Sequence, residues 1–307
     1  MLEDRINTVN HYMKKKFGQR VVRISFDTGF DCPWGKCVFC RNSSFSPKTS
    51  VNMKSDTWLS DLKKNRDFLT KRYKTSFFSV YFQSGTSTFG PEEVLKDFYK
   101  KAVIDESIVS FILSTRPDHI NKEKIEMILE SVPERIDEIW IELGLQSISD
   151  SSLSWLKRGH DKQSYFNALE TIKKYAGDRI KVAPHIILGI PGENYEDMER
   201  TVLESVDHTV VKGLKFHHLQ VHKGTELEKM YEEQKFELFS SEDYIETVSK
   251  IISVIPEEIV LFRLFTTTPA TYLVAPKWNM TTQDALQKLE ERLIVNKIKQ
   301  GSRREMT

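Results

Sequence analysis

The alternation of short, β-rich apolar runs with helical segments constrains the fold of this sequence more than any other feature. Six such runs occur, and a plausible helix pattern follows each of them. This alternation is typical of βα units around a parallel sheet. It predicts an α/β fold, an open, partial (β/α)6 TIM-like barrel related to the eight-unit barrel. The runs are 21–26, 77–82, 108–114, 138–145, 180–188 and 214–222.

The end of the chain departs from this alternation. From residue 242 onward the pattern indicates a helix, a strand around 259–265 and a closing helix. No internal repeat and no Pro/Gly/Ser-rich linker interrupts the 307 residues. We therefore expect a core barrel with an N-terminal extension over 1–240, and a short C-terminal α/β extension over 241–307 packed on the barrel.

The polar segments of the sequence follow the predicted strands. In barrels of this kind, the chemistry lies in loops at the carboxyl ends of the strands. The segments that fall there are 32–40, 83–86, 115–118, 146–147, 189–193 and 223–225. Their positions predict a functional site along one rim of the barrel.

All three cysteines of the chain, Cys32, Cys37 and Cys40, lie within nine positions of the first of these loops. An odd count disfavours a disulfide framework and leaves metal ligation. Structural zinc accepts three thiolates and one histidine, but no second cysteine pair is present. A [4Fe-4S] cluster normally takes four thiolates, so three would leave one iron open to a small ligand. The spacing favours the cluster, and zinc is the alternative.

Net charge and hydropathy limit which partners and which cellular location we expect. The net charge of +1 gives no overall field for nucleic acid, although local basic clusters exist. No apolar run approaches the ~20 residues that a membrane span needs, and the first residues resemble no secretory signal. We expect a cytoplasmic protein with no membrane partner. The basic clusters are Lys14–Lys16 with Arg20 and Arg23, then Lys71, Arg72 and Lys74, and finally Lys297, Lys299, Arg303 and Arg304.

Ordered motifs along most of the chain match a known family. They are Tyr81-Phe82-Gln83, Thr115-Arg116-Pro117-Asp118, the segment 140–147, Arg158-Gly159-His160-Asp161, the segment 189–193 and Lys223-Gly224-Thr225. With them the sequence resembles the radical S-adenosylmethionine (SAM) proteins of the YhcC/YtqA type, which are similar to the radical SAM domain of the elongator catalytic subunit. Two departures are the short Cys32–Cys37 spacing, where these relatives usually carry a longer Gly-rich insertion, and Gly85, where they often carry tyrosine.

The resemblance implies roles for individual residues. Cys32, Cys37 and Cys40 would hold a [4Fe-4S] cluster whose fourth iron binds SAM. Phe39 would lie beside the adenine, with loop packing as the alternative. Glu142 and Gln146 would contact the ribose or the methionine part of SAM, and Arg158 would receive its carboxylate, with an internal ion-pair network as the alternative. The full predicted cofactor set is Phe39, Gln83, Ser84, Gly85, Thr86, Thr115, Glu142, Gln146, Arg158, Gly189 and Pro191.

The resemblance also implies reductive cleavage of SAM to a 5′-deoxyadenosyl radical that abstracts hydrogen from a substrate. His185, His217 and Lys223 are the candidate catalytic residues, with core packing or carboxylate pairing as the alternative. A tRNA wobble nucleoside is the first substrate hypothesis and a small metabolite the second. A zinc-stabilised binding module without catalysis is the third reading. An enzyme of this class would need an electron donor such as flavodoxin or ferredoxin.

Overall fold

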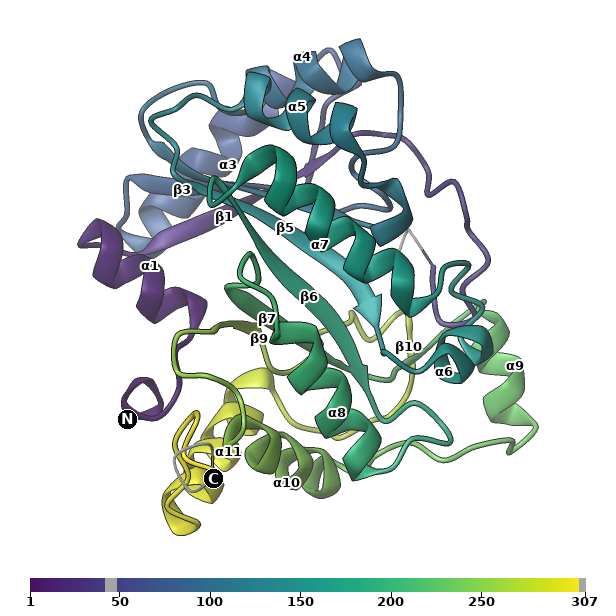
Figure 1. Ribbon diagram of the computed structural model, residues 1–307. Helices are drawn as coiled ribbons and strands as arrows, with labels where there is room; N and C mark the ends of the chain where they lie inside the picture. The colour runs from purple at the N-terminus through teal and green to yellow at the C-terminus, as the bar shows by residue number, and fades with distance from the viewer. Residues whose placement is uncertain (42–48, 304–307) are drawn as a thin grey trace.

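The structure, a computed structural model, describes residues 1–41 and 49–303. Its centre is a curved parallel sheet of eight strands in the order β2-β1-β3-β4-β5-β6-β7-β9 (Figure 1). This confirms the predicted α/β half-barrel class. The strands are β1 Val21–Asp27, β2 Val51–Asn52, β3 Phe77–Phe82, β4 Ile108–Thr115, β5 Glu138–Gln146, β6 Ile180–Leu188, β7 Gly213–His218 and β9 Val260–Arg263.

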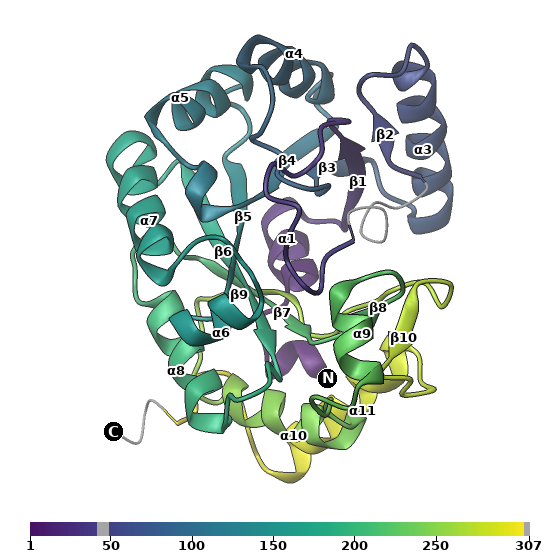
Figure 2. The same ribbon diagram turned by 90° about the vertical axis from the view of Figure 1, so that its right-hand side faces the viewer.

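Helices cover the outer face of the curved sheet, while α1 (Val9–Phe17) lies near the centre of the curve (Figure 2). Local sequence explains where several of them begin. Asn194 caps α8 because its side chain accepts the Asp197 backbone N–H, and Pro91 immediately precedes α4. The other helices are α3 Trp58–Tyr73, α4 Glu92–Ala102, α5 Lys122–Ser131, α6 Asp150–Trp155, α7 Lys162–Ala176, α8 Tyr195–Val206, α9 Glu226–Glu232, α10 Ser241–Ile252 and α11 Thr282–Val295, with 3-10 turns at Leu2–Asp4 and Pro117–His119.

The sixth predicted run is wrong as a single strand. Residues 214–222 divide into β7 and a separate β8 (Val221–His222), which pairs antiparallel with β10 (Leu273–Ala275). The division follows from hydrogen bonding, because β8 leaves the parallel sheet for a partner distant in the sequence. The strand predicted around 259–265 forms β9, which extends the main sheet beside β7. A domain boundary at residue 240 stays a prediction.

The two ends of the barrel interior differ in chemistry. Toward the amino ends of the strands, α1 contacts both β1 and β9, and its Met13 packs with Trp140 and Phe262 in an apolar cluster. That cluster closes the end of the barrel. Toward the carboxyl ends the interior is polar and opens into a cavity. Among the residues described, no helix is long and apolar enough to cross a membrane.

Candidate functional site

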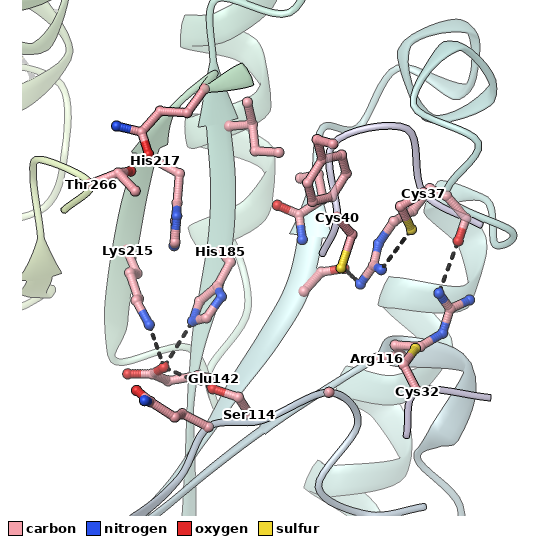
Figure 3. A pocket seen from close by; sticks show the side chains of 18 of the residues that line it. Cys32, Cys37, Cys40, Ser114, Arg116, Glu142, His185, Lys215, His217 and Thr266 are labelled. Atoms are coloured by element: carbon pink, nitrogen blue, oxygen red, sulfur yellow. Dashed lines mark hydrogen bonds and ion pairs between the residues drawn. The ribbon is translucent and has the colours of Figure 1, made fainter. Parts of the chain in front are cut away.

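The three cysteines lie in the loop after β1 and all line the cavity at the carboxyl ends of the strands (Figure 3). None forms a disulfide. Two anchors hold this loop against the segment after α6. The Trp34 indole donates to the Lys157 carbonyl at 2.7 Å, and the Val38 N–H donates to the Leu156 carbonyl at 3.1 Å. The thiols are therefore presented by a loop fixed at two points.

The surroundings of the thiols differ. Burial acts to raise the pKa of Cys32, but the Thr86 hydroxyl, 3.3 Å from its Sγ, and two backbone N–H groups lower the pKa overall. At Cys40, burial and the neighbouring Cys37 raise the pKa to about 12. Within residues 1–41 and 49–303, no three His, Cys, Asp or Glu side chains surround a position for one metal ion. Cluster ligation by the three thiols stays a prediction.

Arg158 crosses the cavity wall beside Cys37. Its Nη2 donates to the Gly144 carbonyl at 2.8 Å and its Nη1 lies 3.5 Å from the Cys37 Sγ. Its Nε is buried and has no hydrogen-bond partner among the described residues. A Cβ at Gly144 would lie 2.5 Å from this Nη2, so the guanidinium position requires glycine there. Arg116 stabilises the backbone at Arg158, because its Nη1 donates a hydrogen bond to the Arg158 carbonyl at 3.0 Å. The site thus offers a guanidinium group next to the thiols.

Glu142 lies further inside the barrel, fully buried in the middle of β5. Burial acts to raise its pKa, but Lys215, His185 and Arg23 hold it well below the usual value. These contacts form the internal ion-pair network that was the alternative to a SAM contact, and a role of Glu142 toward SAM stays a prediction. Its Oε2 accepts from Lys215 Nζ at 2.6 Å, Tyr81 Oη at 2.5 Å, Ser114 Oγ at 3.0 Å and His185 Nε2 at 3.0 Å.

The structure brings most of the predicted site residues to this cavity. Gln146 lines it with φ +80, a left-handed conformation that is strained for a residue with a Cβ and that the surrounding structure must hold in place. The predicted residues that line the cavity are Cys32, Cys37, Phe39, Cys40, Gln83, Gly85, Thr115, Glu142, Gln146, Arg158, His185 and His217.

Five predicted residues lie elsewhere. Ser84 and Thr86 are buried outside the lining, and Thr86 reaches the site through Cys32. Gly189 and Pro191 line a separate depression, where Phe239 packs against Gly189. Lys223 is exposed, and its carbonyl accepts from Arg41 at 2.7 Å. The geometry does not bring these five side chains into the main cavity.

Several lining residues were not among the predicted site residues, and Tyr81, Ser114, Lys215 and Arg263 are the ones that matter most for its charge and hydrogen bonding. Lys215 could have been found, because it lies two residues before His217 and strand alternation places both on one face. Arg263 had no such signal. It belongs to the segment predicted as a C-terminal extension, and only the pairing of β9 with β7 brings it beside Lys215.

Comparison with known families agrees with this geometry. The sequence profile described as the Radical SAM superfamily matches residues 27–204, and the Radical_SAM C-terminal domain matches residues 211–294. The first match begins at the last residue of β1 and contains the cysteine loop and strands β2 to β6. The second contains β7, β9 and most of α11.

Individual relatives extend the match over nearly the whole chain. The uncharacterized protein YtqA of Bacillus subtilis is 28% identical over 95% of this chain and 90% of its own length. Protein YhcC of Escherichia coli is 30% identical over 90% of this chain and 88% of its own length. A tRNA uridine(34) acetyltransferase of Methanocaldococcus infernus is 24% identical over 79% of this chain, which spans about half of that protein (51%).

A solved structure has the same fold. Elp3 from the archaeon Methanocaldococcus infernus superimposes with a TM-score of 0.69 at 19% identity, covering 91% of this chain and 64% of that one. The family profile, the relatives and the half-barrel with three cysteines at its rim lead to one assignment, and membership of this family implies a [4Fe-4S] cluster and SAM. The chain belongs to the radical SAM superfamily.

Proposed function

We propose that this protein is an enzyme that cleaves SAM reductively at a [4Fe-4S] cluster held by Cys32, Cys37 and Cys40. One observation carries the proposal: the three thiols line a single cavity at the carboxyl ends of the strands, on a loop anchored to its neighbours. The donor set fits the cluster. Three thiols are available, the Thr86 hydroxyl bonds to Cys32, and the Arg116 and Arg158 guanidinium groups lie nearby and favour anionic sulfur.

The residues around the thiols would bind and orient SAM. Arg158 would receive the SAM carboxylate, because its guanidinium is buried beside Cys37 and its Nε has no partner. Phe39 would lie against the adenine, and Gln83 would receive the amino group. The cluster, when bound, supplies an electron that splits SAM into methionine and a 5′-deoxyadenosyl radical. The apolar cluster around Trp140 closes the far end of the barrel to water.

The substrate we propose is a tRNA nucleoside. Similarity to a tRNA uridine(34) acetyltransferase supports this choice. Exposed lysines on the loops around the cavity also support it, since phosphates bind such groups. Lys36 and Lys223 are exposed beside the lining residues Cys37 and His222, and neither has an ion pair with a described carboxylate.

The first test is a cysteine variant. We expect Cys37→Ala, prepared without oxygen and reconstituted with iron and sulfide, to form no 5′-deoxyadenosine from SAM and dithionite. Asp31→Ala is the matched control, because Asp31 is exposed in the same loop. Undiminished cleavage by a cluster-loaded Cys37→Ala protein would contradict the ligation. Metal analysis distinguishes the zinc alternative, which requires about one zinc and no sulfide per chain.

A second test addresses the substrate. Total tRNA added to the reconstituted enzyme should raise 5′-deoxyadenosine formation above the rate with SAM alone. The control is the same tRNA after complete digestion to nucleosides, which removes the polymer and its phosphates. No increase with any tRNA pool, together with an increase from a small-molecule extract, would favour the metabolite hypothesis.

A further inference from the structure

The innermost part of the cavity carries an excess of positive charge. We call it the inner end and define it by Glu142, His185, Lys215, His217 and Arg263, all of which line the cavity. Lys215 is only 2% exposed and bonds to Glu142. Arg23 approaches the same carboxylate from outside the lining, with its Nη1 3.6 Å away. Lys215 and Arg23 therefore contact this one carboxylate, and Arg263 lies beside Lys215 as a third cation.

Two groups at the inner end have no hydrogen-bond or ion-pair partner in the part of the chain that the structure describes. The His217 Nε2 is buried and neither donates a hydrogen bond to a described residue nor accepts one from it. The Arg263 guanidinium forms no ion pair or hydrogen bond with any residue in the described ranges, although it faces the cavity beside Lys215. Glu142 hydrogen-bonds to neither group. Its Oε2 accepts from four other groups, and its Oε1 accepts no hydrogen bond from the described residues and lies 3.6 Å from Arg23 Nη1. No carboxylate within residues 1–41 and 49–303 forms an ion pair with Arg263.

Such an arrangement is costly unless something else occupies it. Arg263 is only partly exposed, and a cation withdrawn from water without a counter-charge loses hydration that the protein does not replace. The effect is visible at Lys215, whose pKa burial and the neighbouring Arg263 and Arg23 lower to about 7 against the opposing attraction of Glu142. An anion between Arg263 and His217 would supply both the missing charge and the missing hydrogen-bond acceptor.

We propose that the inner end is a subsite for an oxyanion of the substrate, a carboxylate or a phosphate group, bound by Arg263 and His217 and backed by Lys215. This inference rests on the proposed function in one respect, that the same cavity takes the substrate. It adds the chemical class of the group that enters deepest.

The subsite would orient the substrate. Figure 3 shows His217, Lys215 and His185 on one side of the cavity and Cys32, Cys37 and Cys40 on the other. A substrate held by its oxyanion at the inner end would point its remaining atoms toward the cysteines. Fixing a reactant in this way contributes to catalysis by positioning.

Anion binding to the full-length, cluster-reconstituted protein tests the subsite without turnover. We would titrate inorganic phosphate and, separately, acetate by calorimetry, with no SAM present and with ionic strength held constant by sodium chloride. We expect saturable binding of at least one probe, and an affinity lowered about tenfold or more in Arg263→Gln. His217→Phe should weaken binding as well. Arg72→Gln, which removes an exposed arginine on α3, is the matched control.

Each result of these titrations either supports or overturns the oxyanion subsite. Tighter phosphate binding points to a phosphorylated substrate group, and tighter acetate binding to a carboxylate. No saturable binding of either probe would overturn the subsite, as would unchanged binding in folded Arg263→Gln and His217→Phe proteins. Loss of binding only in Arg158→Gln would place the anion beside the cysteines instead and also overturn it. Because SAM is absent, failure of SAM cleavage would refute the proposed function and leave the subsite measurement intact.

Discussion

Two glutamates on the same inward face of β5 have opposite surroundings. Glu138 and Glu142 are four residues apart, and both are fully buried. Glu138 uses both carboxylate oxygens. Its Oε1 accepts from Lys16 at 2.6 Å and Lys181 at 2.5 Å, and its Oε2 accepts from the Trp140 indole at 2.7 Å. Glu142 has a fully used Oε2 but an Oε1 without a hydrogen bond.

The cations differ as well. Lys16 and Lys181 are 31% and 20% exposed, so their charges reach water at the closed end of the barrel. Lys215 is 2% exposed and depends on Glu142. The comparison shows that Glu138, at the closed end of the barrel, has hydrogen bonds on both carboxylate oxygens. Glu142 belongs to the charged cluster beside the cavity, and its Oε1 accepts no hydrogen bond from the described residues. The first arrangement is structural, and the second fits a binding site.

The largest expected effect compares two lysines on neighbouring strands. Lys215→Met should lower the free energy of unfolding by about 3–5 kcal/mol, because it leaves a buried carboxylate short of its main partner. Lys181→Met should cost about 1 kcal/mol or less, since Lys16 remains on Glu138 and both lysines are partly exposed. Urea unfolding of both variants measures the difference. Equal losses would contradict the comparison.

The second prediction concerns acid. The pKa of Glu142 is lowered in the folded protein, so its ionised form stabilises the fold above its unfolded value near 4.5 and this contribution disappears as pH falls through the lower folded value. Glu142→Gln should therefore be less stable than wild type by about 3 kcal/mol at pH 7. Below pH 4.5 the difference in the free energy of unfolding between wild type and Glu142→Gln should become smaller. A gap that stays constant from pH 7 to pH 3 would show that charge is not its cause.

The third prediction uses two glycines, one at each end of the interior. A Cβ at Gly213 would lie 2.8 Å from Phe262 and 3.0 Å from Trp140, so Gly213→Ala should cost about 1–3 kcal/mol of stability through overpacking and leave SAM affinity unchanged. Gly144→Ala displaces the Arg158 guanidinium and should weaken SAM binding about tenfold. Thermal unfolding and SAM titration of both proteins check the pair. The reverse pattern would refute our division of the interior.

The smallest expected effect is at Gln146. Its positive φ is strained for glutamine and ordinary for glycine, so Gln146→Gly should raise the free energy of unfolding by about 0.5–1 kcal/mol. If the strain serves SAM binding, the same variant should bind SAM more weakly. Gln300→Gly is a contrasting control, because Gln300 has no positive φ and bonds to the Pro256 and Ile259 carbonyls. A lower free energy of unfolding for Gln146→Gly than for wild type would contradict the conclusion that the Gln146 backbone is strained.

The pattern of apolar and polar residues predicted much of the fold, because the formation of longer strands and helices depends largely on neighbouring residues. Runs of β-branched and aromatic residues predicted β1, β3, β4, β5 and β6, and the first part of the sixth run forms β7. It failed for β2, β8 and β10, which have two or three residues each and exist only through pairing. Segments that short carry no periodicity of their own.

The sequence by itself determined the cysteine loop and the half-barrel class, since close ligand spacing and strand–helix alternation are properties of neighbouring residues. Only the tertiary structure decided the composition of the inner end. Glu142, Lys215 and Arg263 come from β5, β7 and β9, and no rule of spacing relates their charges until the strands pair side by side. Electrostatic interaction depends on distance in space and on burial, and both are set by the fold rather than by position along the chain.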